Sequence, residues 1–530
     1  MMDQKMLDAL PLGVSSFSLL RRLNRIYVDK TDLIYRLASG RKKLFLTRPR
    51  RFGKSLLVST FESLFKYGLR DFSGLKIADL WNEDISSYKV IHLDFSGLNG
   101  ATSKKEFSFM LGKTIARCLE ETESGYSGAE PEDFDLWLRK QKDLSVVLLI
   151  DEYDSPLTAV LDRPELFFEI RDVLANFYSY LKTNDRVFRF VFITGITKFS
   201  NLNIFSQLND LEDITLNPYF GGLLGYTHSE IKTYFGEYIQ NAALELNLSE
   251  ASLFNQLIKN YDGFCFERTA QSQVFAPWSI MSFFQYPSLG FLNYWFESGG
   301  KPAVLLRYFK SHSLRRPEEY GKDKNLSLSE LAGSSDMGAI SDLALLTQTG
   351  YLTIKDVKYG IAHLGYPNAE VRTAMANLYL ESLLKGRLAG QVGAGGIVEV
   401  LTHETPESLF HILNRLFASI DYQNYPVKDE ASLRGFVQVY FSGAGLNPHV
   451  EHHSSHGRSD LEVKTGNRQW ILEFKLVDDD SSETKRLEEA LIQLRKYGQD
   501  SSSKEVLKVA LIFSKEKRTF VKWKALNSNE

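Results

Sequence analysis

Three groups of polar residues in this sequence have the types and spacing to bind or hydrolyse phosphate esters. The first offers a lysine and a hydroxyl, the second a pair of carboxylates, and the third two carboxylates with a lysine. Each group lies in or beside an apolar run, which indicates that strands position it. The groups are Gly53-Lys54-Ser55 at the end of RPRRFGKS (48–55), Asp151-Glu152 in LLIDEYD (148–154), and Asp460, Glu473 and Lys475 in SDLEVKT (459–465) and RQWILEFKL (468–476).

The first group has the layout of a phosphate-binding loop, in which a strand leads through a Gly-Lys-Ser turn into the amphipathic segment SLLVSTFESLF. Backbone N–H groups at the helix start would bind phosphate oxygens, and Gly53 would allow close approach of the backbone. Lys54 would reach the β- and γ-phosphates, and the Ser55 hydroxyl would bind Mg²⁺. Arg48 stands where such loops normally carry their first glycine, so the motif alone leaves a chance turn open.

The second group strengthens the nucleotide interpretation. Asp151 would lie beside the Mg²⁺, and Glu152 would polarise the attacking water. Thr194 closes another apolar run and could sense the γ-phosphate. The alternative is an ordinary strand end with solvated carboxylates. The order GKS, LLIDE and VFIT, each at the end of an apolar run, favours a nucleotide site over that alternative.

Four near-continuous apolar runs, separated by helical patterns, would carry these residues. Such runs predict an α/β fold, in which a mostly parallel sheet is covered by helices on both faces. Ligands of these sheets bind at the carboxyl ends of the strands, where the polar residues stand. The runs are LFLT (44–47), VIHLDF (90–95), VVLLID (146–151) and FRFVFIT (188–194).

A β-hairpin would position the third group. Its two segments alternate apolar and polar residues, and Gly466-Asn467 between them is a good two-residue turn. With this turn, the register places Asp460 opposite Glu473. Lys475 then lies on the same face as Glu473, because side chains alternate along a strand.

Two opposed carboxylates repel each other unless a cation lies between them. Carboxylates and water suit Mg²⁺ or Mn²⁺, and a neighbouring lysine can position water or stabilise charge on a phosphodiester. The pattern therefore predicts metal-assisted phosphodiester hydrolysis. An exposed strand face with an ordinary salt bridge at Lys475 is the alternative.

Much of the first half of the chain, residues 10 to 285, resembles the bacterial AAA-ATPase-like domain of the P-loop superfamily. Members of this family replace the first glycine as Arg48 does. The resemblance implies ATP and Mg²⁺ as ligands, and a sheet whose sensor strand, ending at Thr194, separates the acid-bearing strand from the P-loop strand. Arg50 and Arg51 would add positive charge at the phosphates, or would be solvated. The matching stretches are YVDKT (27–31), TRPRRFGKS (47–55), HLDFS (92–96), LIDEYDSP (149–156), FITGITKFS (192–200) and GYTHSEI (225–231).

The segment GRSDLEVKTGNRQWILEFK (457–475) resembles the PD-(D/E)XK nuclease superfamily, which has a restriction-endonuclease-like α/β fold with an αβββαβ core. The resemblance covers residues 400 to 525. It implies an acidic residue at the start of the preceding helix, a motif aspartate, a (D/E)xK pair and a QxxxY element. These positions are Glu430, Asp460, Glu473 with Lys475, and Gln493 with Tyr497.

Two further clusters have less specific patterns. EHHSSH (451–456) contains three histidines, but the sequence offers no CxxC to complete a zinc site, which favours a polar loop. Trp278, Phe283 and Phe284 stand at helical spacing, which favours core packing over a stacking platform for nucleic-acid bases.

Bulk properties limit the functional classes. The length of 530 residues predicts two to four domains, and no apolar stretch is long enough to span a membrane. The N-terminus does not predict a secretory signal, and two distant cysteines suit a reducing cytoplasm. A formal net charge of −3 restricts nucleic-acid binding to local basic patches. The expected segments are an ATPase domain (1–225), a helical lid or winged-helix-like subdomain (226–310), a linker and connecting α/β region (311–400) and a nuclease-like domain (401–530).

The sequence thus predicts an ATP-hydrolysing protein joined to a Mg²⁺- or Mn²⁺-dependent nuclease, with DNA favoured over RNA. The resemblance to these families implies a setting in bacterial defence or mobile-element biology. One alternative is an ATP-dependent signalling or scaffold protein of the STAND kind, whose last domain binds nucleic acid without cutting it. Another is a nuclease with a structural nucleotide, against which Glu152 argues. Many P-loop ATPases complete their site with an arginine from a neighbouring subunit. The sequence leaves the oligomeric state open, and Arg21, Arg22 and Arg189 are candidates for that role if the chain forms a homo-oligomer.

Overall fold

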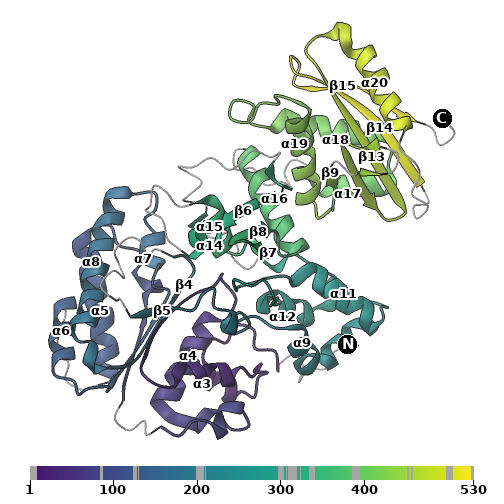
Figure 1. The fold of residues 1–530 in the computed structure, drawn as a ribbon. Helices are drawn as coiled ribbons and strands as arrows, with labels where there is room; N and C mark the ends of the chain where they lie inside the picture. The colour runs from purple at the N-terminus through teal and green to yellow at the C-terminus, as the bar shows by residue number, and fades with distance from the viewer. Residues whose placement is uncertain are drawn as a thin grey trace. The chain divides into compact units, whose positions relative to one another are not determined.

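The computed structural model divides the chain into two compact units (Figure 1), Met1–His312 with Lys324–Asn368, and Ser313–Asp323 with Ala369–Glu530. The connecting region expected at 311–400 is therefore shared between the units, with all of 324–368 in the first. The structure describes residues 9–83, 88–122, 128, 130–198, 208, 210–295, 304–305, 307, 319–322, 324–332, 341–384, 394–450, 453–454, 457–496 and 505–526.

The first unit is built on a five-stranded parallel sheet in the order β2-β3-β4-β1-β5. All four predicted strands are present, and the short β5 was not predicted. Strand β4 separates β1, which leads into the loop, from β3, which ends in Asp151, as the resemblance implied. The strands are β1 (Lys42–Thr47), β2 (Lys89–Asp94), β3 (Val146–Asp151), β4 (Phe188–Gly195) and β5 (Leu211–Asp213).

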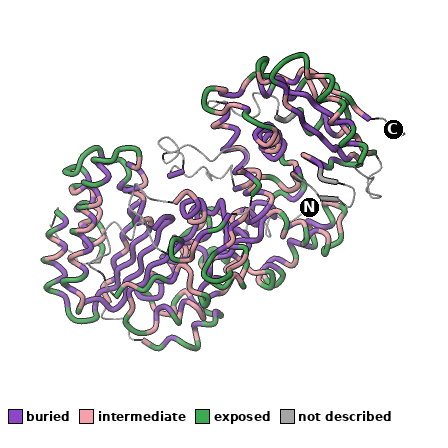
Figure 2. The backbone as a smooth tube through the Cα atoms, turned by 45° about the horizontal axis from the view of Figure 1, so that its top comes forward, coloured by how far each residue is buried: buried purple, intermediate pink, exposed green. Residues whose placement is uncertain are grey.

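Helices cover both faces of this sheet, because its strands are apolar on both sides (Figures 1 and 2). In β4, Val191 and Ile193 belong to the core beneath α5 (Lys104–Thr122), α6 (Pro131–Arg139) and α8 (Pro164–Thr183). On the other face, the rings of Phe190 and Phe192 each lie 5.0 Å from Phe61 of α4 (Lys54–Tyr67). The predicted fold class is confirmed.

A helical subdomain and a small antiparallel sheet complete the first unit. Phe283 and Phe284 are fully buried in the core of the subdomain, as predicted. Trp278 differs from that prediction, because it is only half-buried. The helices are α9 (His228–Tyr234), α10 (Gly236–Glu245), α11 (Glu250–Tyr261) and α12 (Pro277–Gln285). The sheet has the order β6 (Lys324–Ser327), β8 (Ile361–Gly365) and β7 (Thr353–Lys358), and α15 (Asp342–Gln348) lies between β6 and β7 in the chain.

The second unit contains a mixed sheet in the order β15-β14-β13-β12-β9, in which β13 and β14 are parallel and the other pairs antiparallel. The helices and strands of the expected αβββαβ core are present. The strands are β9 (His449–Val450), β12 (Leu461–Thr465), β13 (Arg468–Val477), β14 (Glu505–Ser514) and β15 (Thr519–Leu526), and the helices are α16 (Ala369–Leu383), α17 (Ala394–His403), α18 (Pro406–Ser419), α19 (Glu430–Gly443) and α20 (Glu483–Arg495).

The predicted hairpin register is confirmed, since Thr465 pairs with Arg468 and Leu461 with Leu472. Alternation along β13 separates two packed faces. The Trp470 indole donates to the Leu401 carbonyl of α17 at 2.7 Å, whereas Ile471 belongs to the core beneath α20. Helices on both faces therefore fix the direction in which each side chain of β13 points (Figure 1).

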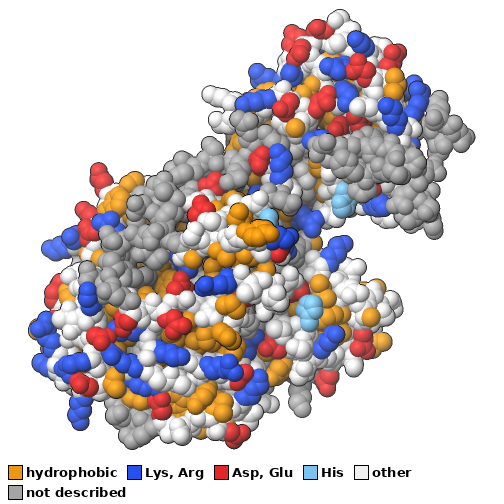
Figure 3. All heavy atoms as spheres, viewed as in Figure 1, with side chains coloured by type: hydrophobic (Ala, Val, Ile, Leu, Met, Phe, Trp, Pro, Cys, Tyr) orange, Lys and Arg blue, Asp and Glu red, His pale blue; other side chains and the backbone are white. Residues whose placement is uncertain are grey.

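On the face drawn in Figure 3, basic and acidic side chains are interspersed in both units. None of the described helices is long and apolar enough to cross a membrane.

Candidate active sites

The loop between β1 and α4 is shaped to bind an anion. Gly53 precedes α4 in the left-handed conformation, with φ of 92°, and this turn directs the first N–H groups of the helix toward the loop. Lys54 is buried, and its ammonium donates to the Pro49 carbonyl at 3.0 Å. Burial lowers the pKa of Lys54, and the charge of Asp151 partly offsets this. The lysine is therefore held in place before any phosphate is bound.

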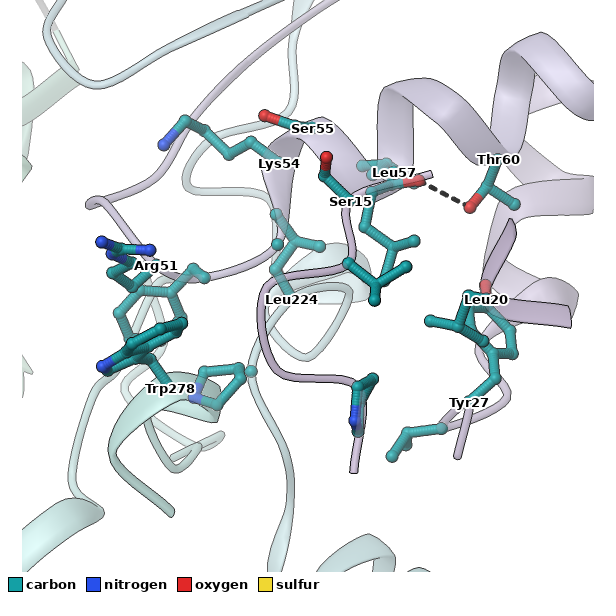
Figure 4. A pocket seen from close by; sticks show the side chains of 18 of the residues that line it. Ser15, Leu20, Tyr27, Arg51, Lys54, Ser55, Leu57, Thr60, Leu224 and Trp278 are labelled. Carbon is teal, nitrogen blue, oxygen red and sulfur yellow. Dashed lines mark hydrogen bonds between the residues drawn. The ribbon is translucent and has the colours of Figure 1, made fainter. Parts of the chain in front are cut away.

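A pocket of about 660 Å³ extends from this loop. Lys54, Ser55 and Arg51 lie around one end of it, whereas Leu20 and Tyr27 lie at the other (Figure 4). One end is thus cationic and the other apolar. Its walls come from the N-terminal segment, the loop, Glu152 and the helical subdomain, which fits the predicted position of a lid.

Asp151 and Glu152 lie where the sheet topology requires them. Asp151 is buried at the end of β3, and its Oδ1 accepts the Glu152 N–H at 2.9 Å. Glu152 adopts φ of 51° and lines the pocket. Burial raises the pKa of the Glu152 carboxyl, and the nearby Lys54 ammonium opposes this rise. The structure therefore brings Lys54, Asp151 and Glu152 together, as their sequence order suggested.

The predicted sensor residue makes a different contact. Thr194 is fully buried, and its hydroxyl donates to the Leu46 carbonyl of β1 at 2.8 Å. Among the described residues, Thr194 is not one that lines the pocket. Its role in sensing phosphate stays a prediction, which would require the hydroxyl to leave this carbonyl.

Asp154 was not singled out in the sequence, although it closes the DEYD segment. It is buried, and its Oδ2 accepts the N–H and hydroxyl of Thr197 at 2.8 and 2.6 Å. A Cβ added at Gly195 would collide with the Asp154 carboxylate. Asp154 therefore fixes the chain after β4 against the end of β3.

Arg48 has a structural role. It is 1% exposed and donates to the carbonyls of Thr47 and Thr215 at 2.9 Å and to that of Phe220 at 3.2 Å. Its guanidinium also lies 4.6 Å from the ring centroid of Phe266. Burial lowers the pKa of Arg48 to about 9. The departure from the usual glycine thus ties the loop to the following elements of the same unit.

Arg48→Gly is expected to lower the free energy of unfolding by about 2 to 4 kcal/mol, because it leaves a cavity and unpaired carbonyls. Thermal unfolding of the full-length protein, monitored by circular dichroism, would measure this change. Arg50→Gly is the matched control, since Arg50 is exposed in the same loop. Equal unfolding temperatures for the two variants would contradict a structural role for Arg48.

The other candidate cations divide into two groups. Arg50 and Arg51 line the pocket, and the Arg51 guanidinium lies 4.2 Å from the ring centroid of Trp278. Lys198, which follows β4 in the matching stretch FITGITKFS (192–200), is instead paired with Asp213. Two of the candidate intersubunit arginines have described contacts within the chain. Arg189 contacts Glu83 and Ala38, and Arg21 contacts Asp71 and Ser73.

In the second unit, the hairpin and α19 bring the predicted charged residues together. Glu473 is 2% exposed, and its Oε1 lies 3.0 Å from Lys475 Nζ. Glu430, the first residue of α19, lies 3.6 Å from the same ammonium. The Oδ2 of Asp460 accepts the Phe474 N–H at 2.9 Å, which holds Asp460 beside the (D/E)xK strand. These contacts confirm the proximity that the hairpin register predicted.

Sequence reasoning missed Arg434. Its Nη1 lies 3.1 Å from Asp460 Oδ1. A signal was present, because Arg434 follows Glu430 by four residues and so lies on the same face of the helix. Gln493 is exposed on α20, and no described hydrogen bond links its side chain to the site. Tyr497 and EHHSSH residues 451, 452, 455 and 456 lie outside the described residues.

The donor set fits a divalent cation in its chemistry. Glu473 Oε2 is buried and has no hydrogen-bond partner among the described residues. Within the described ranges, no three acidic, histidine or cysteine side chains already surround one metal position. Instead, cationic side chains contact the carboxylates: Lys475 lies beside Glu473 and Glu430, and Arg434 lies beside Asp460. Metal binding would therefore require Asp460 or Glu430 to exchange a cationic side chain for the ion.

Burial raises the pKa of Glu473 to about 7, and the charge of Asp460 adds to this rise. The folded protein thus binds this proton more tightly than the unfolded chain does. The resulting stability is complete below the ordinary pKa of 4.5 and is lost as pH rises through 7.

Glu473→Gln is therefore expected to stabilise the metal-free protein at pH 8 by on the order of 1 to 3 kcal/mol, and to match it near pH 5. Thermal unfolding in EDTA between pH 5 and 8.5 would show the difference. Glu489→Gln serves as the control, because Glu489 is an exposed glutamate of α20. A stability difference that does not change with pH would argue against a shifted carboxyl.

Comparison with known proteins gives matches to both units. Residues 11–205 match a family described as a predicted AAA-ATPase, and residues 428–523 match the PD-(D/E)XK nuclease superfamily. A protein of Azotobacter chroococcum mcd 1, described as an uncharacterized protein in the vnfD 5' region, is 31% identical over 486 residues. The alignment covers 88% of this chain and 89% of that protein.

Proposed function

We propose that this chain hydrolyses ATP and cleaves nucleic-acid phosphodiesters, because it belongs to the family that joins an AAA-ATPase-like domain to a PD-(D/E)XK nuclease superfamily domain. One observation carries the nuclease assignment. Glu473 is buried beside Asp460 and Lys475, and one of its oxygens has no hydrogen-bond partner among the described residues. A buried carboxylate in this state costs stability, which a ligand for that oxygen would offset.

In the ATPase unit, the loop N–H groups and Lys54 would bind the β- and γ-phosphates, with Lys54 leaving the Pro49 carbonyl. Ser55 and Asp151 would hold Mg²⁺, which neutralises charge on the phosphates when it is bound with ATP. Glu152 would accept a proton from the attacking water. Its raised pKa, caused by burial, suits a general base.

In the nuclease unit, Asp460, Glu473 and Glu430 would hold Mg²⁺ or Mn²⁺. Such an ion lowers the pKa of bound water and stabilises the phosphodiester transition state. Lys475 would orient the attacking water and offset negative charge as it develops. Its ammonium is already fixed between the Glu473 carboxylate and the Phe474 carbonyl, at 3.0 and 3.2 Å, so little reorganisation is needed.

The nucleotide state would control access of nucleic acid to the nuclease unit, because both activities reside on one chain. DNA is the substrate we favour over RNA. A role in cytoplasmic bacterial defence or mobile-element biology, with a homo-oligomer as the active form, is part of the same proposal.

A second candidate is a signalling or scaffold protein whose nuclease-like unit binds nucleic acid without cleaving it. The contacts of Asp460 favour it to this extent: both oxygens are already hydrogen-bonded, to Phe474 and Arg434. Cleavage requires one of these bonds to be exchanged, whereas binding alone does not. The two candidates therefore differ in metal-dependent activity.

The test uses the full-length protein with plasmid DNA, single-stranded DNA and RNA, in Mg²⁺, Mn²⁺ or EDTA, with and without ATP. We expect metal-dependent cleavage of DNA, a change in its rate on adding ATP, and loss of that change in Lys54→Ala. ATP hydrolysis without cleavage of any substrate would favour the scaffold instead.

A further inference from the structure

One face of α19 contacts two charged residues of the hairpin site, one lysine and one carboxylate. Glu430 and Arg434 lie one helical turn apart, and their partners are Lys475 and Asp460, respectively. The helix therefore supplies one anion and one cation to a site whose motif residues come from the hairpin. The motif assigns a function to Glu430 but none to Arg434.

The two oxygens of Asp460 are held in different ways. Oδ2 accepts the Phe474 N–H, a contact that the backbone of the hairpin fixes. Oδ1 pairs with Arg434 through two side chains that are 15% and 17% exposed. Since side-chain contacts rearrange more easily than backbone contacts, Oδ1 is the oxygen that Asp460 can offer to a metal ion. The guanidinium would then lose its contact with Asp460.

The charge balance of the site indicates what replaces Asp460 beside the Arg434 guanidinium. Counting the described residues of the site with all groups ionised, three carboxylates face two cations, Arg434 and Lys475, and one negative charge remains. A divalent cation would turn this into one positive charge. One phosphodiester carries the single negative charge that restores neutrality. The planar fork of a guanidinium also matches two oxygens of a phosphate.

We propose that Arg434 is a phosphate-binding residue of this site, a role that rests on the proposed nuclease activity. It holds Asp460 in the free protein and binds a non-bridging oxygen of the scissile phosphodiester when Asp460 serves as a metal ligand. Arg434 thus keeps the acidic site ordered without substrate and contributes to substrate binding afterwards.

Binding of Mn²⁺ to the nucleotide-free, full-length protein separates this role from a merely structural one. In Arg434→Met, the cation that competes for Asp460 is absent, so Mn²⁺ is expected to bind about three- to tenfold more tightly, as measured by electron paramagnetic resonance. If Arg434 only positioned Asp460, its loss would weaken Mn²⁺ binding. Arg486→Met, which breaks an exposed Arg–Glu pair of 2.8 Å on α20, is the matched control.

Cleavage is expected to change in the opposite direction. Arg434→Met should lower kcat/KM for DNA about 100-fold at saturating Mn²⁺, and Arg434→Lys about tenfold, because lysine keeps the charge without the fork. Arg434→Lys also keeps the test usable if Arg434→Met fails to fold. Thermal unfolding of the two variants would reveal such a failure.

Tighter Mn²⁺ binding together with slower cleavage would support the proposal. Unchanged or weaker Mn²⁺ binding in Arg434→Met, or a kcat/KM of Arg434→Met within threefold of the unmodified protein, would overturn it while leaving the nuclease in place. Absence of both Mn²⁺ binding and cleavage in the unmodified protein would instead overturn the nuclease activity, and the proposal with it.

Discussion

Lys475→Ala is expected to lower metal-dependent cleavage by about 1,000-fold or more, because it removes the ammonium that, in the proposed mechanism, would orient water and offset charge at the site. The contact of 3.0 Å with Glu473 shows that this cation is positioned within the buried group. A plasmid-nicking assay in Mg²⁺ and Mn²⁺ measures the loss. ATP hydrolysis by the same variant should stay unchanged, since the lysine belongs to the second unit.

A matched control separates this effect from a general change in charge. Lys517 also pairs with a carboxylate of the second unit, Asp480, but its side chain is 45% exposed. Lys517→Ala should therefore cleave at nearly the original rate. If Lys475→Ala kept more than a tenth of the activity, the (D/E)xK lysine would not be the catalytic cation.

The second large effect is expected in the ATPase unit, from a pair of variants. Lys54→Ala should lose both ATP binding and hydrolysis, because the buried ammonium at the pocket is removed. Glu152→Gln should still bind ATP but hydrolyse it at least about 100-fold more slowly, because glutamine cannot accept the proton of the attacking water. Fluorescent-nucleotide binding and phosphate release measure the two properties separately.

Lys66 offers the control for Lys54. It lies on the same helix and pairs with Glu62 at 3.7 Å, but its side chain is 38% exposed. Lys66→Ala should bind and hydrolyse ATP normally. If Glu152→Gln hydrolysed ATP at the original rate, Glu152 would not be the general base. Binding of ATP without hydrolysis by the unmodified protein would instead support the structural-nucleotide alternative.

Local sequence patterns determined the elements of both sites. The strands that end in Thr47, Asp151 and Gly195 followed from apolar runs, because strands covered on both faces need apolar residues throughout. The register of the hairpin followed from a two-residue turn and an alternation of period two. These signals act over a few residues, and so the sequence contains them directly.

Only the tertiary structure decided which side chains those residues meet. Arg48 is a buried structural residue because carbonyls about 170 positions later lie around it. The hydroxyl of Thr194 bonds to β1, a strand 148 residues earlier. Asp460 pairs with Arg434 of a preceding helix, and all of 324–368 belongs to the first unit. Such partners depend on the packing of distant segments, which no local period or turn specifies, because a side chain pairs with whatever the folded chain brings near it.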